Sequence, residues 1–140
     1  MIILDTNVVS ELMAPLPSRL VEEWVRRRRP ADDLFVSAVT VAEILYGIEL
    51  LPQGKRRSGL LIQADAMFCE DFGGRVLPFD EPAARIFGQV AALRRRQGRP
   101  ISTLDAQIAA IARRYEATLA TRDISDFEDC GVRLIDPWRE

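Results

Sequence analysis

Short apolar runs alternate with helical segments along the whole chain, and this alternation restricts the fold more than any other feature of the sequence. Met1–Leu4 and Leu34–Val36 are apolar throughout, which is typical of strands buried in a parallel sheet. Further short strands are predicted at Arg75–Leu77, Ala117–Ala120 and Val132–Ile135. Strands that alternate with helices predict an α/β fold around a mainly parallel five-stranded sheet.

The segments between these strands carry the spacing and the end signals of helices. Apolar residues recur at helical spacing, and proline or glycine follows most of the periodic segments. Thr6 or Asn7 can cap the first helix, and Asp80 can cap a later one. The predicted helices cover residues 8–13, 18–29 (ended by Pro30), 41–51, 56–72 (ended by Gly73 and Gly74), 81–97 and 102–115. The 140 residues show no linker or internal repeat, so a single domain over 1–140 is expected.

Composition excludes several classes of function. Histidine is absent, which removes histidine-based nucleophilic catalysis and histidine–zinc sites. Cys69 and Cys130 are too few for a zinc site or a disulfide framework, and we expect them to be buried, reduced thiols. The N-terminus has no signal-peptide pattern, and no apolar stretch is long enough to cross a membrane, so a cytoplasmic protein is expected.

The net charge of −2 names no partner, but arginines are unevenly distributed. Residues 83–115 contain seven arginines and a single acid, and Arg26–Arg29 and Lys55–Arg57 are further basic runs. Such runs are either solvated helix surface or contacts for nucleic-acid phosphates, and the sequence leaves both open.

Several carboxylates occupy unusual places. Asp5 directly follows an apolar strand, where α/β sheets place ligand sites, although it can also cap the next helix. Glu43 lies in a helix that is apolar on every side, yet Thr40 and Glu43 also have the spacing of a capping box. Asp105 borders an apolar stripe, and it can equally interact with the helix start at Ser102.

Asp123 and Asp126 follow the fourth predicted strand, at the sheet edge where Asp5 is expected. A loop of this composition is also ordinary turn chemistry. Carboxylates gathered closely repel one another unless a cation neutralises them, and Mg²⁺ or Mn²⁺ is the natural counter-charge. Metal-activated water attacks phosphodiesters without any histidine, in agreement with the composition.

In its motifs the sequence resembles the PIN-domain ribonucleases, in the branch of the VapC and FitB toxins of bacterial toxin–antitoxin systems. The resemblance covers essentially the whole chain in family order. The residues that carry it are Ile3–Asn7, Ser37–Glu43, Leu77–Asp80, Asp105–Ala110, Ala120–Asp123, Asp126–Phe127 and Asp136–Trp138.

The resemblance implies a three-layer sandwich and a metal-dependent endoribonuclease that acts as a toxin. The implied acidic pocket consists of Asp5, Glu43, Asp105, and Asp123 or Asp126, and it holds Mg²⁺ or Mn²⁺. Asp5 and Asp105 are the implied direct ligands, Glu43 holds the metal or its water, and Thr6 and Thr121 support the pocket by hydrogen bonds.

The implied partners are an RNA substrate, a second copy of the chain in a homodimer, and a small antitoxin through which operator DNA is bound. We expect the antitoxin to insert an arginine into the pocket, because a guanidinium suits carboxylates. Its helix would use a groove among apolar residues of the early helices, unless these simply form core: Leu12, Leu16, Leu20, Trp24, Leu45, Ile48 and Leu51. Two rival interpretations are a catalytically silent PIN-like module that binds nucleic acid and a metal-dependent phosphatase for small substrates. The second lacks a Gly-rich phosphate loop.

Overall fold

The computed structural model describes residues 1–28 and 34–140, and its strands form one parallel sheet. The strand order is β3-β2-β1-β4-β5, and each neighbouring pair is parallel. This confirms the predicted five-stranded α/β fold. The strands are β1 (Ile2–Leu4), β2 (Leu34–Ser37), β3 (Val76–Leu77), β4 (Thr118–Ala120) and β5 (Arg133–Ile135).

Helices fill the connections between the strands. None of those in the described ranges combines the length and the apolar character needed to cross a membrane. The helices are α1 (Thr6–Met13), α2 (Arg19–Arg28), α3 (Ala38–Glu49), α4 (Lys55–Ala66) with a π-helical turn η2 (Met67–Asp71), α5 (Glu81–Arg96), α6 (Thr103–Arg114) and a 3₁₀ turn η3 (Ile124–Phe127).

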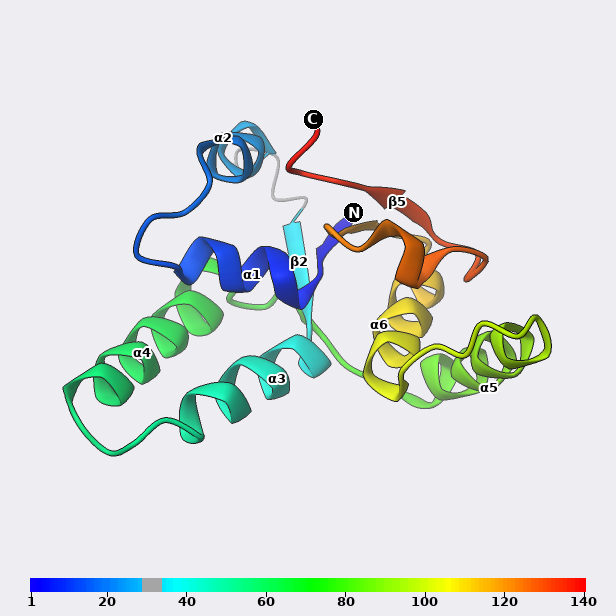
Figure 1. The fold of residues 1–140 in the computed structure, drawn as a ribbon, viewed down its shortest axis with the longest axis horizontal. Helices are drawn as coiled ribbons and strands as arrows, with labels where there is room; N and C mark the ends of the chain where they lie inside the picture. Colours follow the sequence, from blue (N-terminus) through cyan, green and yellow to red (C-terminus); the bar gives the residue numbers. More distant parts are fainter. Residues whose placement is uncertain (29–33) are drawn as a thin grey trace.

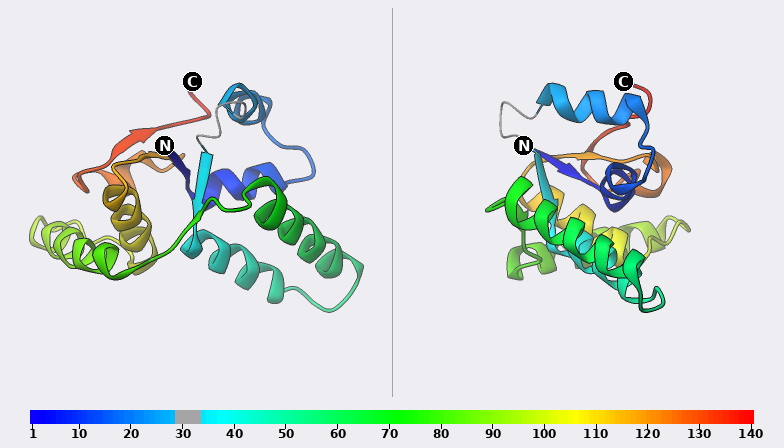
Figure 2. Two further views of the ribbon diagram at one scale, coloured as in Figure 1. Left: turned by 180° about the vertical axis from the view of Figure 1, so that it is seen from behind. Right: turned by 90° about the vertical axis from the view of Figure 1, so that its left-hand side faces the viewer.

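The helices cover both faces of the sheet, as Figures 1 and 2 show. Side chains alternate across a strand, so Leu4 joins a core cluster with α1, α2 and α4, and Ile3 joins a second cluster with α5 and α6. Both residues are fully buried. The protein is therefore a three-layer sandwich whose two cores lie on opposite faces of the sheet.

The chain order creates a crevice at the carboxyl ends of β1 and β4. From β1 the chain builds β2 and β3 on one side, then returns to add β4 and β5 on the other side. Helices that leave adjacent strands toward opposite faces cannot fill the space between them, and ligands of open α/β sheets bind there. The backbone N–H of Asp5 donates to the carbonyl of Ala120 at 2.9 Å, which joins the two strand ends directly.

Some predicted boundaries were wrong. The helix predicted over 41–51 begins earlier, because Ser37 caps it: its Oγ accepts from the N–H of Thr40 at 3.1 Å. The helix predicted over 56–72 passes into the π-helical turn after Ala66. Cys69 lies in that turn and is exposed, against the expectation that both thiols are buried. The predicted helix end at Arg29 and Pro30 lies outside the described residues.

Candidate active site

A hollow of about 440 Å³ lies at the carboxyl ends of β1 and β4. Four of the predicted acids line it, and each comes from a different segment: Asp5 after β1, Glu43 in α3, Asp105 in α6 and Asp123 after β4. We call this site the acidic hollow. Its lining residues are Asp5, Thr6, Asn7, Ser10, Glu11, Glu43, Asp105, Arg122, Asp123 and Trp138.

Asp5 is the most buried carboxylate of the hollow, with 5% of its surface exposed. It is the N-cap of α1, so the prediction of a cap at Thr6 or Asn7 was wrong. One carboxylate oxygen accepts from the N–H of Thr6 and the other from the hydroxyl of Thr121, both at 2.8 Å. Burial nevertheless raises the pKa of Asp5 to about 6. The two hydrogen bonds oppose this shift, and the charges of Asp105 and Glu43 add to it.

Glu43 is held by a chain of hydroxyl groups. The Thr6 hydroxyl donates to Glu43 Oε1 at 2.8 Å and lies 2.9 Å from the hydroxyl of Thr40. The predicted capping box of Thr40 and Glu43 is absent, because Ser37 is the cap and Glu43 lies further along the helix. A helix that is apolar on every side is expected to be buried all round, but α3 is not, since Tyr46 is 67% exposed. Glu43 is half-buried, and its carboxylate is placed by tertiary contacts.

Asp105 satisfies both of its predicted interpretations. Its N–H donates to Oγ of the N-cap Ser102 at 3.2 Å, as the cap predicts, and its side chain lines the acidic hollow. Burial raises the pKa of Asp105, against the Ser102 hydrogen bond. The charges of Asp126 and Asp123 raise the pKa further.

Of the two candidate fourth acids, Asp123 lines the hollow and Asp126 does not. Asp123 accepts a hydrogen bond from the amide of Asn7 at 3.1 Å, and its N–H donates to Thr121 Oγ1 at 3.1 Å. Asp126 lies on η3. Its charge nevertheless raises the pKa of Asp105 more than the charge of Asp123 does. Lining geometry therefore favours Asp123, whereas the charges of both acids act on Asp105.

A buried arginine supports the loop that carries these two acids. Arg94 of α5 is 5% exposed, and its Nη1 donates to the carbonyls of Asp126 at 2.8 Å and Glu128 at 3.0 Å. Its Nε donates to the carbonyl of Arg99 at 2.8 Å. These contacts fix the loop after β4 to the helix beneath it.

Several residues of the site were missed by the sequence analysis. Asn7 bridges the hollow, because its amide also donates to Thr121 Oγ1 at 3.2 Å. Thr40 holds the hydroxyl of Thr6. Arg122 and Trp138 line the hollow together. Asn7, Arg122 and Trp138 lie in the quoted motifs, but only the three-dimensional contacts assign them to this hollow.

The donor set of the hollow fits a hard divalent cation. Within 1–28 and 34–140, no three acidic or cysteine side chains form a ready-made metal cage. Mg²⁺ does not require one, because it binds through one or two carboxylates and keeps several waters. Burial, with a smaller contribution from the charges of Asp105 and Glu43, raises the pKa of Asp5, and a cation in the hollow would stabilise the ionised form of this carboxylate.

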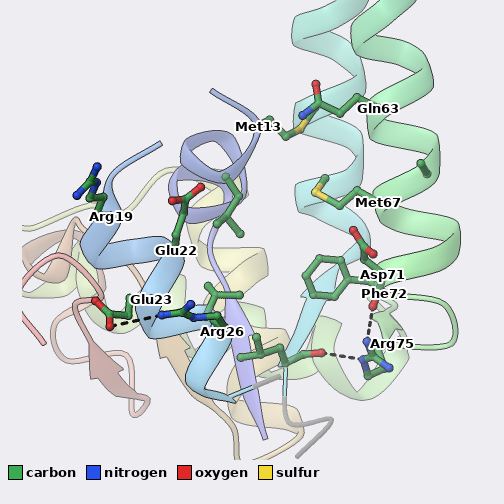
Figure 3. A pocket seen from close by; sticks show the side chains of 14 residues that line it. Met13, Arg19, Glu22, Glu23, Arg26, Gln63, Met67, Asp71, Phe72 and Arg75 are labelled. Atoms are coloured by element: carbon green, nitrogen blue, oxygen red, sulfur yellow. Dashed lines mark hydrogen bonds and ion pairs between the residues drawn. The ribbon is translucent and has the colours of Figure 1, made fainter. Parts of the chain in front are cut away.

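A second and larger hollow, of about 760 Å³, lies between α2 and the α4–η2 segment on the side of the sheet that α1 covers (Figure 3). Met13, Met67 and Phe72 give it apolar walls, and charged side chains of α2 line its other side. Of the seven residues proposed for a helix groove, only Leu12 lines it. Trp24 is fully buried, which agrees with the interpretation of these residues as core.

Comparisons with known proteins agree with the observed fold. The sequence matches the family described as PIN domain over residues 2–131. It is 39% identical to Toxin FitB of Neisseria gonorrhoeae over the full length of both chains. It is 40% identical to VapC ribonuclease Y4jK of Sinorhizobium fredii, over 99% of this chain and 98% of that one. A solved structure of FitAB bound to an IR36 DNA fragment superposes with a TM-score of 0.90 at 39% identity, covering 99% of this chain and 96% of that chain.

Proposed function

Because this chain belongs to the PIN-domain family, in its VapC and FitB branch, we propose that it is a ribonuclease toxin that hydrolyses RNA with Mg²⁺ or Mn²⁺. The observation that carries the proposal is the meeting of four carboxylates from four segments in one hollow at the reversal of strand order. A relative at 40% identity is named a ribonuclease, which supports RNA as the substrate. The reaction would take place in the cytoplasm, where RNA is available.

Asp5 and Asp105 are the proposed metal ligands, and Glu43 and Asp123 would hold metal-bound water. A bound divalent ion lowers the pKa of a water molecule and offsets the charge of the phosphodiester under attack. Asp5 and Asp105 suit direct contact because both line the hollow, and burial raises the pKa of both, so a neighbouring cation would stabilise their ionised forms.

The hydroxyl groups around these acids set their orientation. Thr121 donates to the Asp5 carboxylate, and Thr6 donates to Glu43. In each of these two carboxylates, one oxygen is thus held by a threonine hydroxyl, and the remaining lone pairs point away from that hydroxyl. Thr6 and Thr121 are positioning residues in this proposal, as the resemblance implied.

An antitoxin is the proposed partner, because the superposed structure is a FitAB complex with DNA. We expect DNA to be bound through that partner. The apolar walls of the second hollow suit an amphipathic antitoxin helix. Two exposed leucines add to this apolar surface: Leu16 on the segment that joins α1 to α2, and Leu20 at the start of α2. The homodimer stays a prediction from the resemblance.

The principal rival is a PIN-like module that binds nucleic acid without cleaving it. All four acids line the hollow, and three of them are held by hydrogen bonds from neighbouring side chains, which a binding module does not require. The clustered arginines are compatible with either function.

The test is cleavage of a labelled RNA by the purified chain. We expect activity with Mg²⁺ or Mn²⁺, none in excess EDTA, and none for Asp5→Asn or Asp105→Asn. Asp65→Asn is the matched control, because Asp65 is exposed on α4 outside the hollow, and this variant should cleave normally. Cleavage that persists in EDTA or in Asp5→Asn would refute the proposal. If the purified chain cleaves RNA as expected, sequencing of RNA ends after its brief expression without the antitoxin would identify the substrate.

A further inference from the structure

The acidic hollow presents a difficulty for any RNA substrate. Five carboxylates line it, including Glu11, and RNA is itself a polyanion. A bound cation neutralises only part of this charge. Some group at the rim must attract the nucleic-acid backbone and hold it in register with the ligands.

Arg122 is the one cation among the residues that line the hollow. Although five carboxylates line the same hollow, its guanidinium forms no ion pair or hydrogen bond with any residue in 1–28 or 34–140. It lies instead over the ring of Trp138, 5.1 Å from the centroid. A cation–π contact of this kind orients a guanidinium without consuming its N–H donors.

The backbone around Arg122 is fixed to the site. Its N–H donates to Asn7 Oδ1 at 3.4 Å, and the residues on either side, Thr121 and Asp123, are hydrogen-bonded to Asp5 and Asn7. The guanidinium therefore extends from a rigid base beside the carboxylates.

Trp138 is placed by the end of the chain. It follows β5, whose carboxyl end lies beside that of β4, and its N–H donates to Asp136 Oδ1 at 2.9 Å. The indole is partly buried: it packs on the core cluster that contains Leu4, and it also lines the hollow. The part of the indole that the guanidinium leaves uncovered, and the planar guanidinium itself, are both surfaces on which an unpaired base can stack.

We propose that Arg122 and Trp138 form a nucleotide-binding subsite beside the metal ligands, in which Arg122 contacts a backbone phosphate and Trp138 stacks on an unpaired base. The proposal rests on the proposed function for its choice of RNA. It goes further because the subsite would select single-stranded over paired RNA, since a base within a duplex cannot reach the indole.

Binding is measured separately from cleavage, in the Asp5→Asn background with Mg²⁺, by fluorescence anisotropy of an end-labelled single-stranded oligoribonucleotide. Arg122→Gln should weaken binding about tenfold. It should also reduce the slope of log Kd against log salt concentration by about one, which corresponds to one phosphate contact. Arg122→Lys keeps the charge and should keep that salt dependence. Arg133→Gln is the control and should bind normally, because Arg133 is exposed at the start of β5, outside the hollow and outside the basic runs.

The indole is tested with Trp138→Leu and Trp138→Phe. Loss of one base–aromatic stack weakens binding by about five- to a hundredfold. We expect Trp138→Leu to show such a loss for single-stranded RNA and none for the same RNA annealed to its complement. Trp138→Phe keeps an aromatic face and should recover most of the affinity. On the wild-type background, Arg122→Gln should raise KM much more than it lowers kcat.

Unchanged RNA binding and unchanged KM in Arg122→Gln would overturn the proposal, and so would equal losses in Trp138→Leu for single-stranded and duplex RNA. Failure of the proposed function is a different result. In that case the wild-type chain would cleave no RNA, while the binding measurements would still report on the subsite.

Discussion

Replacing Asp5 by asparagine should stabilise the metal-free protein at neutral pH. Burial, with added repulsion from Asp105 and Glu43, raises the pKa of Asp5 from 3.8 to about 6. The folded state therefore holds the Asp5 proton more tightly than the unfolded state. The free energy of unfolding falls as pH rises from about 4 to about 6 and is constant above that range. At about 1.4 kcal/mol per pKa unit, the full loss is about 3 kcal/mol.

Asparagine avoids this loss because it carries no charge at any pH, but it disturbs one hydrogen bond. Its amide would replace the oxygen that accepts from Thr121, whose Oγ1 already accepts from Asn7 and from the N–H of Asp123. We assign about 1 kcal/mol to that conflict. The net gain at pH 7.5 is then about 2 kcal/mol, or about 6 °C in Tm for a chain of this size.

The assay is urea unfolding in EDTA at pH 4 and pH 7.5, followed by circular dichroism. Asp5→Asn should exceed the wild type by about 2 kcal/mol at pH 7.5 and lose that advantage at pH 4. Addition of Mg²⁺ should raise the Tm of the wild type more than that of the variant, because only the wild type keeps both proposed ligands. A variant that is less stable than the wild type at pH 7.5, or a difference that does not change with pH, would refute the reasoning. Asp65→Asn should show no such pH dependence.

Three further outcomes follow from the same contacts. Arg94→Met should lower stability by about 3 kcal/mol in urea unfolding, because buried carbonyls lose their donor, whereas Arg95→Met on the exposed side of α5 should change little. Asp123→Ala should reduce the rate of RNA cleavage more than Asp126→Ala, since only Asp123 lines the hollow, and the opposite order would reverse their assignment. Changing the antitoxin arginine that we expect in the acidic hollow to alanine should restore nuclease activity to the complex or weaken binding strongly. If neither occurs, inhibition does not act by filling the hollow.

The sequence predicted the sheet well because its signals are local. Each strand lies in a short, largely apolar run, and the starts of α5 and α6 are marked by Asp80 and Ser102, which are their N-caps as expected. The predicted start of α3 was wrong because the sequence contains two hydroxyl residues that could each cap the helix. Ser37 takes that role, and Thr40 turns instead toward Thr6, which only the packing of α1 against α3 decides.

The candidate site was predicted in part for the same reason. Acids at strand ends are visible in a sequence, because aspartate is unusual there. Arg122 and Trp138 were not assigned to it, since an arginine in a loop and a tryptophan near a chain end have many roles. Their contact depends on β5 lying beside β4, and no local pattern carries that information.

The capping and site interpretations of these acids are two consequences of one arrangement. Asp5 is the N-cap of α1, and Asp105 lies in the first turn of α6, so both stand at helix N-termini that meet at the acidic hollow. The positive ends of the helix dipoles and the N–H groups there stabilise negative charge. They do not outweigh the loss of solvation on burial, which raises the pKa of both acids. The fold can therefore hold the carboxylates together without a cation, and the remaining uncompensated charge is what would make a cation bind.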